Sequence, residues 1–125
     1  MKRNPYLKYL GKEDILQNKI MNYIKYNYPS VLYTHVSNEG KRTPFEQFKM
    51  KFLGSKAGLP DIMIFTPNDN YNGLAIELKV GYNKPTNNQK YWLKELEDNN
   101  WKTCWHNNYE NVINEINNYF KDGKT

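Results

Sequence analysis

The chain of 125 residues contains one cysteine, Cys104, so no disulfide framework can form within it. It also lacks any apolar run near the length of about 20 residues that a helix needs to cross a bilayer. Its first residues, Met-Lys-Arg-Asn-Pro, lack the apolar stretch of a secretion signal, so we expect an intracellular protein without membrane contact. This length suffices for a hydrophobic core, and we expect a single domain over residues 1–125.

Several motifs of well-known enzyme classes are absent as well. There is no glycine-rich phosphate loop, no Gly-x-Ser-x-Gly elbow and no His-Glu-x-x-His pair. Hydrolysis driven by a nucleotide or by a serine nucleophile therefore has no support, and we expect no nucleotide cofactor. Cys104 and His106 are near neighbours in the sequence but lack the further partners of a zinc site, so we interpret them as structural residues.

Negative charge is scarcer than positive charge. The chain has 18 Lys and Arg against 13 Asp and Glu, for a formal net charge of +5, which favours a polyanionic partner such as DNA. A local excess lies between residues 41 and 56, where one acid, Glu46, stands among five basic residues, Lys41, Arg42, Lys49, Lys51 and Lys56. A solvated helix face explains any single lysine here. Lys41, Arg42 and Lys56 are the candidates for phosphate contact, because such contacts supply affinity without reading sequence.

Two carboxylates follow this basic segment. Asp61 closes the sequence Gly58-Leu59-Pro60-Asp61, and Glu77 and Lys79 lie within the apolar run 74–80. Successive side chains of a strand point to opposite faces, so Glu77 and Lys79 should share one face. If Asp61 opens a neighbouring strand, its carboxylate can meet that of Glu77, and two hard oxygen ligands can hold Mg²⁺ or Mn²⁺. This spacing suits a metal-dependent phosphodiesterase.

The same three residues have simpler interpretations. Asp61 follows a proline, and a Pro-Asp pair commonly forms a turn at the start of a strand. Lys79 could form an ion pair with neighbours on its own face of the strand. Glu77 could face solvent on an open sheet. However, a charged residue inside the apolar run 74–78 is costly to bury unless it is paired or bound to a metal. We therefore interpret Asp61, Glu77 and Lys79 as catalytic.

Hydrophobic periodicity and capping residues predict a mixed α/β fold with the element order αβαββαβα. Thr43 and Thr86 each begin a capping box, and Pro29 ends the first helical pattern. The turn residues 67–70 predict an antiparallel pairing of the strands on either side. The helices are expected at about 13–27, 44–53, 87–99 and 109–120, and the strands at about 31–36, 60–66, 73–80 and 101–105.

In their order and spacing these residues resemble the PD-(D/E)xK nuclease superfamily, and within it the virus-type replication-repair nuclease (VRR-NUC) domain in its stand-alone phage or bacterial form. The resemblance is carried by Glu13 to Gln17, His35 to Arg42, Gly54 to Asp61, and Glu77 to Lys79 followed by Gln89. It implies a restriction-endonuclease-like core, a mixed sheet flanked by helices. It also implies a DNA endonuclease that depends on Mg²⁺ or Mn²⁺.

The resemblance implies roles for further residues. Glu13 would be an acidic metal-site residue, Leu78 would add its backbone carbonyl as a metal ligand, and Gln89 would lie at the catalytic site. Yet the helix dipole alone favours an acid at Glu13, and Gln89 is also the N3 residue of its capping box. His35 stands before a basic turn and is a candidate for DNA contact, although a structural role is the commoner one for such a histidine.

Stand-alone members of the family resemble homodimeric enzymes that cut branched DNA such as four-way junctions. We therefore expect a homodimeric, Holliday-junction-resolvase-like enzyme of DNA repair or recombination. One alternative is a monomeric nuclease that nicks or trims DNA without junction preference. Another is a DNA-binding adaptor that has kept the fold and lost catalysis. The mass in solution separates the first alternative from the main hypothesis, and a cleavage assay separates the second.

Overall fold

A computed structural model describes residues 3–36 and 43–122 of the chain. After a short 3₁₀ helix that the sequence did not predict, helices and strands follow in the predicted order αβαββαβα, which is confirmed. The elements are η1 (Pro5–Tyr9), α1 (Lys12–Asn27), β1 (Tyr33–His35), α2 (Pro44–Phe52), β2 (Ile62–Ile64), β3 (Leu74–Leu78), α3 (Asn87–Asp98), β4 (Lys102–His106) and α4 (Tyr109–Asp122).

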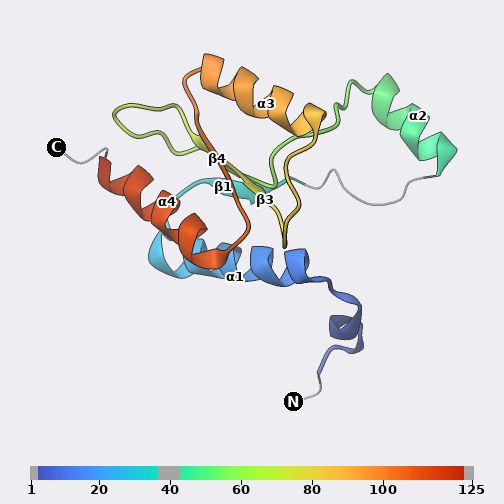
Figure 1. The fold of residues 1–125 in the computed structure, drawn as a ribbon, viewed down its shortest axis with the longest axis horizontal. Coiled ribbons are helices and arrows are strands. Elements are labelled where there is room, and N and C mark those ends of the chain that lie inside the picture. Colours follow the sequence, from blue (N-terminus) through green and yellow to red (C-terminus); the bar gives the residue numbers. More distant parts are fainter. Residues whose placement is uncertain (1–2, 37–42, 123–125) are drawn as a thin grey trace.

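The four strands form one mixed sheet in the order β1-β2-β3-β4 (Figure 1). β2 pairs antiparallel with both β1 and β3, as the turn between β2 and β3 predicted. β4 pairs parallel with β3, because α3 carries the chain back across the sheet before β4 begins. In this parallel pair Glu77 lies opposite Trp105 and Leu78 lies opposite His106. β1 and β4 are therefore the edge strands, and β3 lies inside the sheet.

Helices cover both faces of the sheet, with α1 and α4 on one face and α3 on the other (Figure 1). The even-numbered residues of β3 pack toward α1 and α4, which leaves Glu77 on the face that α3 covers. Shortening a fully buried isoleucine of this core to alanine should cost about 2–5 kcal/mol. The core cluster consists of Ile20, Ile24, Ile62, Ile64, Leu74, Ile76, Leu78, Val112, Ile113, Ile116 and Tyr119.

Three strands are shorter than the sequence predicted. β1 covers 33–35 within the predicted 31–36, β2 covers 62–64 within 60–66, and β3 covers 74–78 within 73–80. Pro60 and Pro67 limit β2, because proline has no amide hydrogen for the ladder. No helix in the described part of the chain has the length and apolar character that crossing a membrane requires.

Candidate active site

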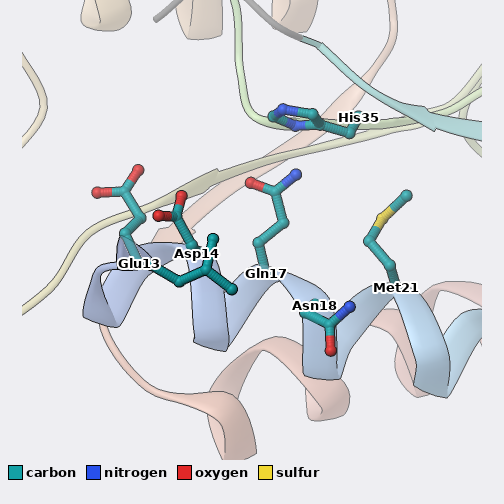
Figure 2. A pocket seen from close by; sticks show the side chains of 7 residues that line it. Glu13, Asp14, Gln17, Asn18, Met21 and His35 are labelled. Carbon is teal, nitrogen blue, oxygen red and sulfur yellow. The ribbon is translucent and has the colours of Figure 1, made fainter. Parts of the chain in front are cut away.

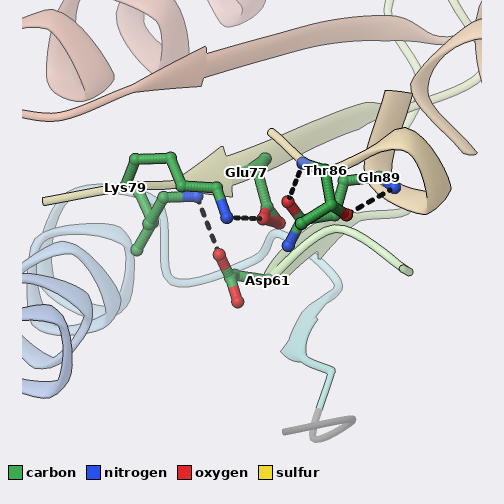
Figure 3. Close-up of polar contacts among 6 residues, drawn as sticks. Asp61, Glu77, Lys79, Thr86 and Gln89 are labelled. Carbon is green, nitrogen blue, oxygen red and sulfur yellow. Dashed lines mark hydrogen bonds and ion pairs between the residues drawn. The ribbon is translucent and has the colours of Figure 1, made fainter. Parts of the chain in front are cut away.

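Asp61 is the last residue before β2, and it is held beside the end of β3. Its carboxylate oxygen Oδ2 accepts a hydrogen bond of 2.7 Å from the backbone amide of Leu78 (Figure 3). The antiparallel pairing of β2 with β3 creates this meeting, because the start of one strand lies next to the end of the other. Only 3% of Asp61 is exposed. The predicted encounter of Asp61 with the strand of Glu77 is thus present in the structure.

The loop before Asp61 is fixed by its packing against α3. Gly58 has a positive φ of 97°, and a Cβ atom there would lie 2.6 Å from the backbone of Asn88. The indole Nε1 of Trp92 donates a hydrogen bond of 3.0 Å to the carbonyl of Ala57. Only glycine combines this backbone conformation with such a close approach. The two contacts hold the segment that delivers Asp61 to the sheet.

Glu77 is the most unusual residue of the core, with only 1% of its surface exposed. Neither of its carboxylate oxygens accepts a hydrogen bond from the part of the chain that the structure describes. Its one ionic neighbour within that part is Lys79, whose Nζ lies 3.5 Å from Oε2. This ion pair agrees with the alternation that places both side chains on one face. A buried carboxylate with unsatisfied oxygens costs several kcal/mol unless another charge compensates it.

The electrostatics of the site follow from this burial. Burial raises the pKa of Glu77 to about 8, the neighbouring charge of Asp61 adds to the increase, and Lys79 opposes it. Two carboxylates at close range repel each other, and a divalent cation between them would remove the repulsion. The oxygen donors of Asp61 and Glu77 are the kind that Mg²⁺ and Mn²⁺ prefer. The residues present therefore fit a divalent metal ion.

A depression of about 410 Å³ lies between the amino-terminal half of α1 and His35 (Figure 2). Glu13 and Gln17 of α1 line it and point toward the sheet (Figure 2). The Nδ1 atom of His35 lies 3.0 Å from the backbone carbonyl of Asp61, which connects this depression to the carboxylate site. Glu13 thus lies beside His35 in this depression, on the side of the sheet that α1 covers, and its role as a metal ligand stays a prediction.

The remaining predicted site residues have different surroundings. Gln89 forms the capping box, since its Oε1 accepts a hydrogen bond of 2.8 Å from the amide of Thr86 (Figure 3). The side chain of Leu78 lies in the core while its amide holds Asp61, and its carbonyl as a metal ligand stays a prediction. Lys56 is exposed in the loop before Asp61. Lys41 and Arg42 lie outside the described residues.

Cys104 and His106, which we interpreted as structural residues, have a third neighbour that the sequence did not indicate. Glu115 of α4 approaches both, and one potential ligand atom of each residue lies within 4.8 Å of the others. The Nε2 atom of His106 is 3.2 Å from Oε1 of Glu115. Burial, followed by the charge of Glu115, raises the pKa of the Cys104 thiol and keeps it protonated in this environment. Only the packing of α4 on β4 could reveal the third residue.

Two carboxylates from neighbouring antiparallel strands, with a lysine two residues after the second, form the arrangement typical of PD-(D/E)xK nucleases. The family model of the VRR-NUC domain matches residues 8–106. A solved structure described as a VRR_NUC domain protein is 29% identical, covers 91% of this chain and 92% of its own, and superposes with a TM-score of 0.74. No curated protein matches the sequence. The chain belongs to the VRR-NUC family, whose members are nucleases of the PD-(D/E)xK superfamily.

Proposed function

We propose that residues 1–125 act as one divalent-metal-dependent DNA endonuclease domain. The observation that carries this proposal is the buried Glu77, which lies beside Asp61 with both carboxylate oxygens lacking hydrogen bonds from the described residues. These carboxylates would hold Mg²⁺ or Mn²⁺, which would supply the positive charge that polarises a scissile phosphate and lowers the pKa of a water molecule. Asp61, Glu77, Glu13 and the carbonyl of Leu78 are the proposed ligands.

Each neighbouring residue then has a distinct task. The amide of Leu78 fixes the carboxylate of Asp61, so one proposed ligand is oriented before any ion arrives. Lys79, held 3.5 Å from Glu77, places a positive charge where negative charge develops on the phosphate in the transition state. Gln89 caps α3 at the edge of the site and keeps the α3 terminus in place. We assign Lys79 to the chemical step and Gln89 to positioning.

The proposal includes a homodimer, and α2 supports it. Phe45, Phe48 and Phe52 lie along one side of this helix, each between 63% and 78% exposed, and the rings of Phe48 and Phe52 stack at 6.0 Å. No residue of α2, which lies wholly within the described part of the chain, is buried. An exposed aromatic stripe is costly in water and typical of a protein interface. A second copy of the chain offers the same stripe about a two-fold axis.

A two-fold dimer carries two active sites, which suits paired cuts on opposing strands of a branched substrate. The proposed substrate is therefore branched DNA, such as a four-way junction, and the basic residues Lys41, Arg42 and Lys56 would contact its phosphates. His35 is a further candidate for contact, although its Nδ1 already meets the Asp61 carbonyl. The alternative is a monomeric nuclease without junction preference.

A cleavage assay on four DNA substrates tests the proposal. Four-way, flap, single-stranded and linear duplex DNA are incubated with the protein, with and without Mg²⁺ or Mn²⁺. We expect cleavage only with metal, and paired cuts on the four-way junction. Asp61→Asn should be inactive, whereas Asp69→Asn, which neutralises an exposed carboxylate in the hairpin loop, should cut normally. Cleavage that persists in Asp61→Asn, or in the presence of a chelator, would overturn the metal-dependent assignment.

A further inference from the structure

A second depression, of about 400 Å³, lies next to the strand that carries Glu77. Three elements surround it: the loop between β3 and α3, one side of α3, and the edge strand β4. Its apolar part is made by Pro85, Leu93 and Trp105, and lysines stand at its rim. Neither the proposed metal site nor the α2 stripe uses these residues.

Trp105 connects this depression to the active site. In the parallel pairing of β3 with β4 it lies opposite Glu77, so both side chains project from the same face of the sheet on strands about 4.8 Å apart. Pro85 and Leu93 are buried beside it, yet 40% of Trp105 remains exposed. Part of this large aromatic surface is therefore open to a flat ligand in the depression. The open ring surface lies one strand away from the carboxylate proposed to act in cleavage.

The charges around the depression favour an anion. Lys84 and Lys90 are both exposed at the rim. Lys94 is already paired with Asp98 at 2.9 Å, and Glu97 accepts a hydrogen bond from the hydroxyl of Thr103. Two lysines with no such pairing in the described part of the chain therefore stand beside the aromatic surface. Aromatic and cationic groups together match a nucleotide, whose base stacks and whose phosphate is negative.

We infer that this depression holds one unpaired nucleotide of the DNA substrate, with the base against Trp105 and the phosphate at Lys84 and Lys90. The inference rests on the proposed function, because it takes the substrate to be the DNA cut at Asp61 and Glu77. Within a duplex both faces of a base are covered by stacked neighbours, so only an unpaired base can present a face to the indole. The depression therefore selects DNA with an unpaired base near the cut, such as a flap or a branch point at which a base pair has opened.

Binding measurements in the Asp61→Asn background test this inference without cleavage. Fluorescence anisotropy compares three labelled DNAs: a blunt duplex, the same duplex with a short thymidine tail, and the duplex with an abasic tail of equal charge. We expect the thymidine tail to bind at least about fivefold more tightly than the abasic tail, the lower range for one stacked base. Trp105→Ala should remove this difference, and Trp105→Phe should keep most of it.

Two further variants separate stacking from charge and from general damage. Lys84→Ala with Lys90→Ala should weaken binding of both tails alike and reduce the dependence on salt, because the phosphate is common to both. Tyr26→Ala removes an aromatic ring from α1 that is more exposed than Trp105, and it should change nothing. If Trp105→Ala does not fold, the comparison of thymidine and abasic tails in the unaltered pocket decides alone. Equal affinity for these two tails overturns the inference.

The binding result for the two tails and the cleavage result for the wild-type protein test the nucleotide pocket and the nuclease separately. Cleavage by the wild-type protein with Mg²⁺, combined with equal affinity for both tails, removes the nucleotide pocket and leaves the nuclease. Discrimination between the tails without cleavage of any DNA removes the nuclease and leaves the pocket. A loss of affinity for the blunt duplex equal to that for the thymidine tail in Trp105→Ala also counts against the inference, since it indicates a general effect.

Discussion

β3 and α2 break the same rule of protein burial in opposite directions. β3 buries a carboxylate, Glu77, with 1% of its surface exposed. α2 exposes three phenylalanines and has no buried residue among the described ones. Hydrogen bonds stabilise both elements: the ladders with β2 and β4 hold β3, and the capping box of Thr43 and Glu46 holds the start of α2. Neither the buried carboxylate nor the exposed phenylalanines stabilise the isolated chain.

The buried carboxylate of β3 and the exposed phenylalanines of α2 each cost free energy in the isolated chain, and each cost indicates a binding partner outside the chain. A buried carboxylate whose oxygens accept no hydrogen bond costs several kcal/mol, and a divalent cation at the site would offset that cost. Exposed apolar surface costs about 25 cal/mol per Å², and a second protein surface recovers it. The same domain thus shows one feature suited to an ion and another suited to a partner. Each can be disrupted separately.

The largest expected effect is on catalysis at β3. Lys79→Ala should reduce the single-turnover rate of cleavage by about 10²-fold or more, because it removes a charge that acts in the transition state. DNA binding and metal binding should largely survive. Lys25→Ala, which removes an exposed lysine from the last turn of α1, is the matched control and should cut at the wild-type rate. Near-normal turnover by Lys79→Ala would show that the lysine has a structural role only.

The next effect concerns α2. Phe48→Glu should shift the protein from dimer to monomer, since a charge in the centre of an apolar interface is strongly unfavourable. The mass in solution, measured by light scattering over a range of concentrations, gives the answer. Tyr26→Glu, at an equally exposed aromatic of α1, should leave the mass unchanged. A wild-type protein that is monomeric at high micromolar concentration contradicts the assignment of the stripe to a dimer.

A smaller effect is expected on stability without metal. Glu77 has an ordinary pKa of 4.5, and burial raises it to about 8 in the folded protein. Between these values the unfolded chain loses the proton while the folded chain keeps it, so the stability from Glu77 is lost as the pH rises toward 8. Glu77→Gln cannot lose a proton. Its melting temperature should therefore exceed that of the wild type by a margin that widens from pH 5 to pH 8.

Thermal melts in a chelator measure this margin, which should reach several degrees, since 1 kcal/mol shifts the melting temperature by about 4 °C in a domain of this size. Millimolar Mg²⁺ or Mn²⁺ should raise the melting temperature of the wild type and not that of Glu77→Gln. Glu110→Gln, on an exposed turn of α4, provides the control. A constant margin across this pH range, or an equal metal response in both proteins, argues against the site.

The smallest effect is expected from the basic residues between positions 41 and 56. Replacing Arg42 and Lys56 with alanine should weaken binding to all DNA substrates alike, because phosphate contacts carry no sequence information. The slope of log affinity against log salt should fall by about 2, roughly one unit for each contact. Binding isotherms at several salt concentrations measure it. Lys121→Ala in the last turn of α4 is the control, and an unchanged slope in the double variant places the DNA elsewhere.

Much of the fold could be predicted because its signals are local. The capping boxes at Thr43 and Thr86 mark the starts of α2 and α3, where the structure has them. The alternation in β3 placed Glu77 and Lys79 on one face, and their ion pair agrees. The turn after β2 predicted an antiparallel hairpin, which is confirmed. These properties depend on neighbours within a few residues, so they are readable along the chain.

The order of the elements, the family and the polar residues that can do chemistry are all readable along the chain. The fold establishes which of these residues meet: Asp61 with the amide of Leu78, and Glu115 with Cys104 and His106. The fold also places Trp105 opposite Glu77, because the parallel pairing joins two strands that are separated in the sequence by the whole of α3. Contacts between residues far apart in the chain depend on register and helix packing, which no local pattern encodes.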